Sequence, residues 1–173
     1  GYQGLGEPLC WIAFGPLATT AALLVLSPAM KNANIIPWKT ALLLGSGPAV
    51  ATTLVLFCAN FHQVVEDFDH GKRTLIVRLG TQRAAGFVPL FVILCFGLES
   101  IPIMQGKWPI TTLLGTIGLP PAIELIRLLK RHHNHPKLIR ESKFLALRFQ
   151  AFNGIGLSIG LILGRFLNLE FIN

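Results

Sequence analysis

The sequence has little charge and no long polar segment. Only 13% of its 173 residues are charged, whereas 52% are hydrophobic, and the mean hydropathy is +0.59. Soluble domains carry roughly 25% charged residues. The shortage of charge therefore argues against an ordinary water-soluble domain and predicts an integral membrane protein.

Cysteine motifs are also missing. Cys10, Cys58 and Cys95 are widely separated, odd in number and never arranged as CxxC. Such a set argues against a disulfide framework and against a thiolate metal site. All three fall in apolar runs, so we expect them to act as small buried hydrophobic residues.

Five apolar runs are each close to the ~20 residues needed to cross a membrane. No alternating pattern typical of a membrane β-barrel is present, so helices are the expected spanning elements. The sequence thus predicts an all-α, polytopic transmembrane helix bundle forming one domain. The expected spans are Leu9–Leu26, Thr40–Asn60, Ala84–Gln105, Trp108–Leu129 and Phe149–Leu167.

The net charge of +7 is distributed unevenly. If the spans alternate in direction, the loops 60–83 and 127–148 share one side and hold eleven of the fifteen Lys and Arg residues. This is the positive-inside pattern, which places both loops in the cytoplasm, or in the stroma of a plastid. The basic balance is explained without a nucleic-acid partner, and we expect none.

The segment NFHQVVEDFDHGKRTLIVRLG, residues 60–80, is unusually polar for its place at the end of a span. If the helix continues past Asn60, then Asn60, Gln63 and Asp67 lie on one face, with Glu66 beside them. Mg²⁺ prefers oxygen ligands and commonly takes several from a bound phosphate. We therefore predict a Mg²⁺ site, with Asp67, Glu66 and Asp69 as candidate ligands.

Basic residues follow these acids at once. Gly71 can end the helix, and Lys72, Arg73 and Arg78 come next. Ammonium and guanidinium groups stabilise the charge that develops on a departing diphosphate. A single charged residue beside a span is an ordinary solvated flank, but acids followed within six residues by a Gly-Lys-Arg turn form a more specific pattern.

Three stretches resemble one family. GKRTLIVRLGT (71–81), FHQVVED (61–67) and GYQGLGEPLCWIAFGPLATT (1–20) are similar to the UbiA superfamily of intramembrane aromatic prenyltransferases. The resemblance is closest to the branch that prenylates 1,4-dihydroxy-2-naphthoate (2-carboxy-1,4-naphthoquinone) in menaquinone and phylloquinone biosynthesis. Members have about nine helices and a first acidic motif that is not found here. Residues 1–173 are therefore expected to be the C-terminal portion of one transmembrane domain, inactive alone and taken from the interior of a longer protein.

The resemblance implies Mg²⁺-dependent transfer of a phytyl or other long isoprenoid group from its diphosphate to the naphthoate. The protein would be a multi-pass protein of a cyanobacterial plasma or thylakoid membrane, or of a plastid membrane. One departure is that Gln63 stands where many members have the first Asp of Asp-x-x-x-Asp. The implied roles are catalysis for Asp67, Glu66 and Lys72, diphosphate binding for Lys72, Arg73 and Arg78, and pocket lining for Asn60, His62 and Gln63.

Other functions remain open from the residues. Within the same fold, the acceptor could be homogentisate or a chlorophyllide. From different classes come a non-enzymatic carrier or channel, with the charged loop as a gate or lipid-binding collar, and a structural membrane subunit. The isoprenoid chain length and the oligomeric state are not predicted.

Further polar residues lie outside this segment. Glu124 and Arg127, spaced i and i+3, are expected to pair at a helix end. Glu99 is explained by the membrane interface near the outer end of its span. The histidines of HHNHP (132–136) are expected in a solvated loop, with lipid contact as the alternative.

The last span raises two alternatives of its own. Its first turns carry Arg148, Gln150 and Asn153, which either reach a carboxylated aromatic acceptor or act as interfacial anchors. Farther along, three glycines at four-residue spacing favour close helix packing inside the chain, with dimerisation as the alternative. These are Gly156, Gly160 and Gly164.

Overall fold

The computed structural model describes residues 4–26 and 36–167, and these form helices and turns without strands. Five helical segments are long and apolar enough to cross a membrane, which confirms the predicted all-α bundle. Their bounds are Gly6–Leu26, Trp38–Ala59, Thr81–Met104, Ile110–His132 and Pro136–Phe166.

The first segment is interrupted near its middle. Helix α1 (Gly6–Ile12) passes into a π-helical turn, η1 (Ala13–Leu17), and then into α2 (Ala18–Leu26). Pro16 lies in the turn, where its missing N–H removes a backbone hydrogen bond. Gly15 lies in the same turn, and a Cβ there would stand 2.6 Å from the Cβ of Ala49, so the turn also sits close against a neighbouring helix.

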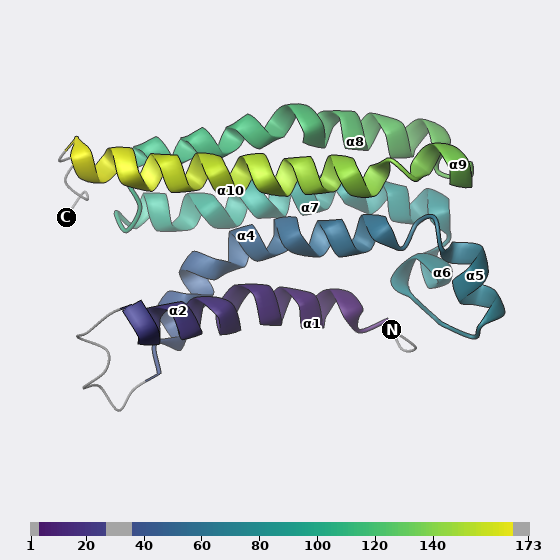
Figure 1. The fold of residues 1–173 in the computed structure, drawn as a ribbon, viewed down its shortest axis with the longest axis horizontal. Coiled ribbons are helices and arrows are strands. Elements are labelled where there is room, and N and C mark those ends of the chain that lie inside the picture. Colours follow the sequence, from purple (N-terminus) through teal and green to yellow (C-terminus); the bar gives the residue numbers. More distant parts are fainter. Residues whose placement is uncertain (1–3, 27–35, 168–173) are drawn as a thin grey trace.

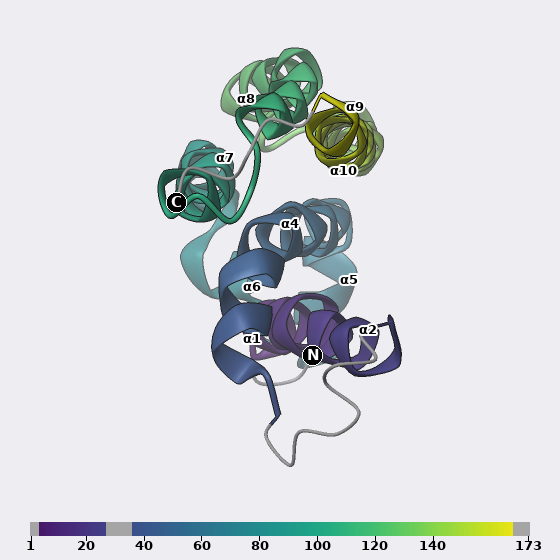
Figure 2. The same ribbon diagram turned by 90° about the vertical axis from the view of Figure 1, so that its left-hand side faces the viewer.

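Helix α4 (Trp38–Ala59) occupies the centre of the bundle. It contacts α1, η1 and α2 on one side, and α7 (Thr81–Met104) and α10 (Ser142–Phe166) on the other (Figure 2). Its buried residues include Leu54 and Phe57, whose side chains are fully enclosed. Phe57 packs edge-on against Phe61 and tilted against Phe91. This helix therefore joins the two halves of the bundle.

The fourth segment begins as a 3-10 helix, η2 (Ile110–Gly118), and continues as α8 (Leu119–His132). The backbone of η2 lies directly against α10. A Cβ added at Gly156, Gly160 or Gly164 would overlap Leu114, Thr111 or Pro109 respectively. Apolar burial does not drive helices together in lipid, so such close backbone packing stabilises the pair. The prediction that these glycines pack inside the chain is confirmed.

The fifth segment starts earlier than predicted. A short helix, α9 (Pro136–Ile139), precedes α10, which begins at Ser142 rather than near Phe149. The first two turns of α10 carry Lys143 and Arg148, and their polarity hid the helix from a hydropathy reading. The structure thus corrects the start of this span.

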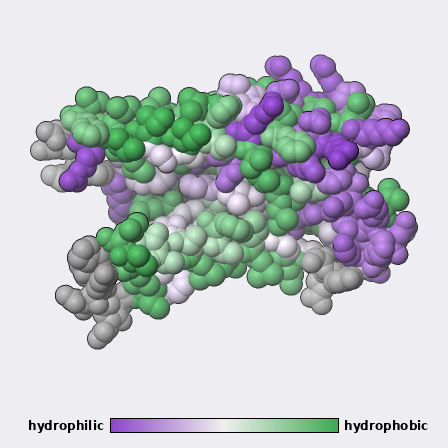
Figure 3. All heavy atoms as spheres, viewed as in Figure 1, coloured by the Kyte–Doolittle hydropathy of each residue, from purple (hydrophilic) through white to green (hydrophobic). Residues whose placement is uncertain are grey.

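The arrangement of the helices confirms that both basic loops lie at the same end of the bundle. The turn after α4, with the short helices α5 (Val64–Asp69) and α6 (Leu75–Leu79), lies at the same end of the bundle as α9 (Figure 1). Hydrophilic atoms gather at that end, while hydrophobic atoms cover much of the remaining visible surface (Figure 3). We call this end the basic end.

Candidate functional site

The site begins with a correction to the predicted helix. α4 ends at Ala59, and a turn over residues 60–63 separates it from α5. Asn60, Gln63 and Asp67 therefore do not lie along one continuous helix. The turn nevertheless brings all three to the lining of one cavity of about 180 Å³. The prediction that they converge is supported, although the geometry that achieves it is different.

The turn that leads away from Asp67 is fixed by its backbone. Gly71 has φ of +69°, a conformation that favours glycine, and its N–H donates to the Phe68 carbonyl. The Lys72 N–H then donates to the Asp67 carbonyl at 2.8 Å. The helix therefore ends before Gly71, as predicted, and the reversal brings Lys72 back to Asp67.

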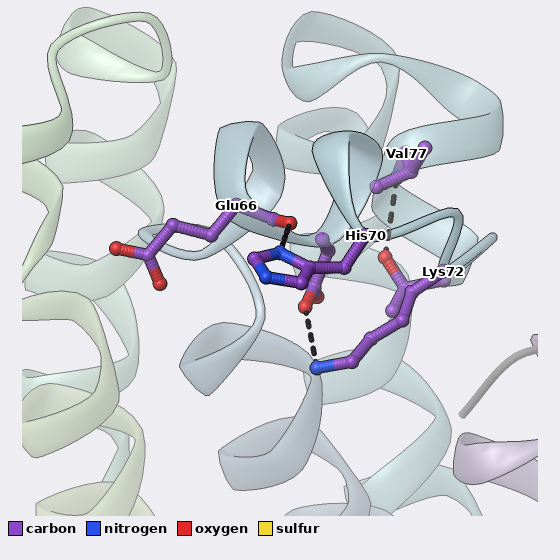
Figure 4. A network of polar contacts seen from close by, with 6 residues as sticks. Glu66, His70, Lys72 and Val77 are labelled. Atoms are coloured by element: carbon purple, nitrogen blue, oxygen red, sulfur yellow. Dashed lines mark hydrogen bonds and ion pairs between the residues drawn. The ribbon is translucent and has the colours of Figure 1, made fainter.

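Asp67 and Lys72 form the centre of the site. Asp67 is only 4% exposed, and its Oδ1 accepts a charge-assisted hydrogen bond from the Lys72 Nζ at 3.0 Å (Figure 4). Since Lys72 itself is partly exposed, this pair connects the buried carboxylate to the surface. An ion pair of this kind can be rearranged by an incoming anion or cation.

Glu7 was missed by the sequence analysis. It lies in the first turn of α1, is 6% exposed and lines the same cavity as Asp67. The Asn60 Nδ2 donates to its Oε1 at 3.4 Å. A carboxylate in the first turn of an apolar span was the available signal, because ionisable groups within spans are costly. The cavity therefore has two buried carboxylates, contributed by segments about sixty residues apart.

The three predicted diphosphate residues also come together. Lys72, Arg73 and Arg78 line a second cavity of about 440 Å³, with Phe68, Gly71 and Val77 completing the wall. Lys72 lines both cavities. The two spaces thus meet at one ammonium group, one lined by acids and amides and the other by three cations. We call the two spaces together the acid-base site.

The other predicted site residues lie outside both cavities. Glu66 and Asp69 are exposed, and the Glu66 carboxylate points away from Lys72 (Figure 4). The backbone carbonyl of Glu66 accepts a hydrogen bond from the His70 ring at 2.7 Å. His62 is half-buried but lines neither cavity. The structure therefore does not bring Glu66, Asp69 or His62 to the acid-base site.

The donor set of the first cavity fits a hard cation. Carboxylate oxygens of Glu7 and Asp67, with amide oxygens of Asn60 and Gln63, are ligand types that Mg²⁺ accepts. Mg²⁺ is usually held by one or two carboxylates while phosphate and water supply the rest. No cluster of three His, Cys, Asp or Glu side chains occurs in the described ranges, so a complete protein cage is not formed there.

Glu99 and Asn153 correct two further predictions. Glu99 is 5% exposed inside the bundle rather than at its interface, and its Oε2 accepts a hydrogen bond from the Asn153 Nδ2 at 3.0 Å. Asn153 also donates to the Gly115 carbonyl, and Cys95 donates to the other Glu99 oxygen. These groups, named here the buried polar cluster, join α7, η2 and α10, so Asn153 is not available to an acceptor.

Two remaining expectations have different outcomes. Gln150 donates to Thr52 on α4 at 3.3 Å, which makes it a helix-packing residue rather than an acceptor contact. The predicted ion pair between Glu124 and Arg127 is not formed among residues 4–26 and 36–167. Glu124 and Arg127, both exposed on α8, instead line a shared cavity.

The fold and this geometry define a class: a multi-pass α-helical membrane protein with an acid-base site at one membrane end. Comparison with known proteins narrows that class. The chain is 35% identical over 160 residues to the 2-carboxy-1,4-naphthoquinone phytyltransferase of the cyanobacterium Synechocystis, which covers 92% of this chain and 50% of that protein. It is 36% identical over 166 residues to the chloroplastic 2-carboxy-1,4-naphthoquinone phytyltransferase of Arabidopsis thaliana. This match covers 95% of this chain and 43% of that protein.

The predicted resemblance to this branch of prenyltransferases is thereby confirmed over almost the whole chain. The chain spans about half the length of the curated relatives it matches. No protein-family model matches it. No solved structure matches it either.

Proposed function

We propose that the protein of which this chain is a part transfers a phytyl or similar long isoprenoid group from its diphosphate to 1,4-dihydroxy-2-naphthoate. The observation that carries the proposal is the acid-base site. There, the cavity lined by Glu7 and Asp67 and the cation cavity, which is lined by Lys72, Arg73 and Arg78, share Lys72 as a lining residue. The names of the two relatives support both the transferred group and the acceptor, which is the reduced form of 2-carboxy-1,4-naphthoquinone.

Lys72, Arg73 and Arg78 would bind the diphosphate in their shared cavity. The bond between the isoprenoid C1 and the diphosphate oxygen breaks, and the electron pair leaves with the diphosphate. The three cations neutralise the charge that develops there. The ring carbon that bears the carboxylate then forms the new carbon–carbon bond. Carbon dioxide leaves, and the electron pair of its bond to the ring stays on the ring and restores the aromatic system.

Asp67 and Glu7, assisted by the amides of Asn60 and Gln63, would hold Mg²⁺ beside the diphosphate. The ion would supply positive charge to the phosphate oxygens. Asp67 would then exchange its contact with Lys72 for a contact with the ion, releasing the ammonium group toward the diphosphate. The exposed carboxylates of Glu66 and Asp69 are the weaker candidates because they line neither cavity.

Product formation by the complete protein in membranes tests this proposal. We expect phytyl diphosphate and 1,4-dihydroxy-2-naphthoate to give a prenylated naphthoquinol that requires Mg²⁺. Asp67→Asn should lower turnover on the order of 100-fold or more, because it removes a carboxylate charge that would hold Mg²⁺ beside the diphosphate.

Each other outcome assigns a different function. Turnover with homogentisate or a chlorophyllide, and none with the naphthoate, would overturn the acceptor. Equal output with and without Mg²⁺, and in Asp67→Asn, would overturn the site. Binding of neither substrate would favour a carrier or a structural subunit.

A further inference from the structure

A second polar cavity lies at the basic end, between α8 and α10. It measures about 450 Å³ and shares no residue with the acid-base site. Its charged lining comes from both helices and from the loop that joins them. The lining residues are Glu124, Arg127, Leu128, Arg131, His132, Glu141, Phe144, Leu145 and Arg148. We call this space the arginine pocket.

The three arginines of this pocket carry unsatisfied charge. Arg127, Arg131 and Arg148 are exposed, and none makes an ion pair or a side-chain hydrogen bond within the described part of the chain. Glu124 and Glu141 also lie in the pocket, but neither comes within ion-pair distance of the guanidinium groups. Three cations against two carboxylates leave a positive surplus, which attracts an anion.

The position of the pocket indicates the source of that anion. Arg127 and Arg131 lie in the last two turns of α8, and Arg148 lies in the second turn of α10. Both turns are at the basic end, where the apolar surface of the bundle gives way to the hydrophilic surface (Figures 1 and 3). Lipid phosphates lie where the apolar surface of a membrane protein ends, and basic pockets between spanning helices are suited to such headgroups.

The rest of the lining fits a lipid better than a free phosphate. Phe144 is exposed at the pocket, and Leu128 is a half-buried part of the same lining, so apolar surface adjoins the arginines. The carboxylates of Glu124 and Glu141 can accept hydrogen bonds from headgroup hydroxyls. A phospholipid therefore matches all three parts of the lining. Its phosphate fits the arginines, its headgroup hydroxyls fit the carboxylates, and its acyl chains fit the apolar side chains.

We propose that the arginine pocket binds the headgroup of an anionic, hydroxyl-bearing membrane phospholipid. Arg127 and Arg148 contact its phosphate from the two helices, and Arg131 extends the same cationic surface toward the loop. His132, the last residue of α8 and the first of HHNHP, also lines the pocket. Within HHNHP, the lipid contact is therefore assigned to His132.

Thermal unfolding of the complete protein in a neutral detergent tests this proposal. The midpoint Tm is measured against short-chain phosphatidylglycerol, short-chain phosphatidylcholine and inorganic phosphate. We expect phosphatidylglycerol alone to raise Tm with saturation. In the double variant Arg127→Gln/Arg148→Gln, the half-saturating concentration should rise about tenfold, the loss expected when charge-assisted contacts worth roughly 1.4 kcal/mol are removed.

The matched control is Lys137→Gln/Arg140→Gln. It removes the same charge from exposed residues of the same loop that do not line the pocket, and its half-saturating concentration should change less than about threefold. If the first double variant does not fold, Arg148→Gln against Arg140→Gln makes the same comparison with about a threefold difference.

Three results would overturn the proposal. The first is an equal response to phosphatidylglycerol and phosphatidylcholine. The second is an equal loss of response in the pocket and control variants. In the third, inorganic phosphate alone reproduces the saturable shift, which would assign the pocket to a soluble anion. Because the readout is binding, it is independent of whether the proposed transfer reaction takes place.

Discussion

Two polar regions of this molecule contain buried carboxylates, and they use them in opposite ways. In the buried polar cluster, the Glu99 oxygens accept hydrogen bonds from Asn153 and Cys95, so these polar groups satisfy one another's hydrogen bonding. At the acid-base site, Asp67 pairs with Lys72 and faces a cavity of about 180 Å³. Glu99 also lines a cavity, but that cavity measures only about 70 Å³ and its surface is mostly apolar. The difference shows that burial alone does not identify a functional acid; the partners of the carboxylate and the polar lining of its cavity do.

The backbones of the two regions differ accordingly. The cluster lies between long helices, α7 and α10, and the 3-10 helix η2. The acid-base site is built from turns and the short helices α5 and α6, with glycines of positive φ at positions 71 and 80. Short elements at the membrane end can adjust to a substrate, whereas long packed helices cannot do so without loss of stability.

The largest effect that separates the regions is expected from Arg73→Gln/Arg78→Gln. Both side chains line the cation cavity and are exposed, so their loss should leave folding intact. Two lost charge-assisted contacts should lower kcat/KM about 100-fold. Steady-state kinetics with the complete protein measures this change, and Lys137→Gln/Arg140→Gln is the charge-matched control. Equal kcat/KM in Arg73→Gln/Arg78→Gln and in the control variant would contradict binding of the diphosphate in this cavity.

The next effect is expected in the buried polar cluster. Asn153→Leu removes the amide that donates to Glu99 and to the Gly115 carbonyl. A buried acceptor left without its donor costs about 2 kcal/mol, so Tm should fall while turnover per folded molecule stays within about threefold. Thermal unfolding and normalised activity are compared, with Gln150→Leu as a milder control. Lost turnover at unchanged Tm would place the cluster in the reaction.

A smaller effect is expected at Glu7. Glu7→Gln keeps the shape of the side chain and its contact with Asn60, but removes one of the two carboxylates of the cavity. We expect the Mg²⁺ concentration for half-maximal activity to rise about tenfold, with little change in Tm. An unchanged Mg²⁺ response would assign Glu7 to packing alone.

The smallest effect is expected for the exposed acids. Glu66→Gln/Asp69→Asn should change turnover less than about threefold, because neither carboxylate lines the acid-base site. The Mg²⁺ titration used for Glu7 gives the measurement. A loss as large as that of Asp67→Asn would show that α5 rotates in the complete protein.

Much of this organisation could be predicted from the sequence. The five spans and the shared end of the basic loops follow from hydropathy and charge, which act locally. The reversal at Gly71 and the convergence of Lys72, Arg73 and Arg78 follow from turn chemistry over a few residues. These features depend on short stretches of chain, and the structure agrees with them.

The features that could not be predicted depend on tertiary contacts. The pattern of Asn60, Gln63 and Asp67 fits a continuous helix as well as it fits a turn followed by a new helix. Glu7 and Asn60 meet across 53 positions, and Glu99 and Asn153 across 54. No local pattern encodes such pairs, so both Glu7 and the buried polar cluster became visible only in the folded chain.

The 3-10 helix η2 also changes how the fourth segment fits its membrane. A 3-10 helix advances about 2.0 Å per residue, against about 1.5 Å for an α-helix. Its nine residues therefore make this segment about 4 Å longer than an all-α segment with the same residue count. The segment can match a thicker bilayer without additional residues, and its thin backbone lets the glycines of α10 lie directly against it.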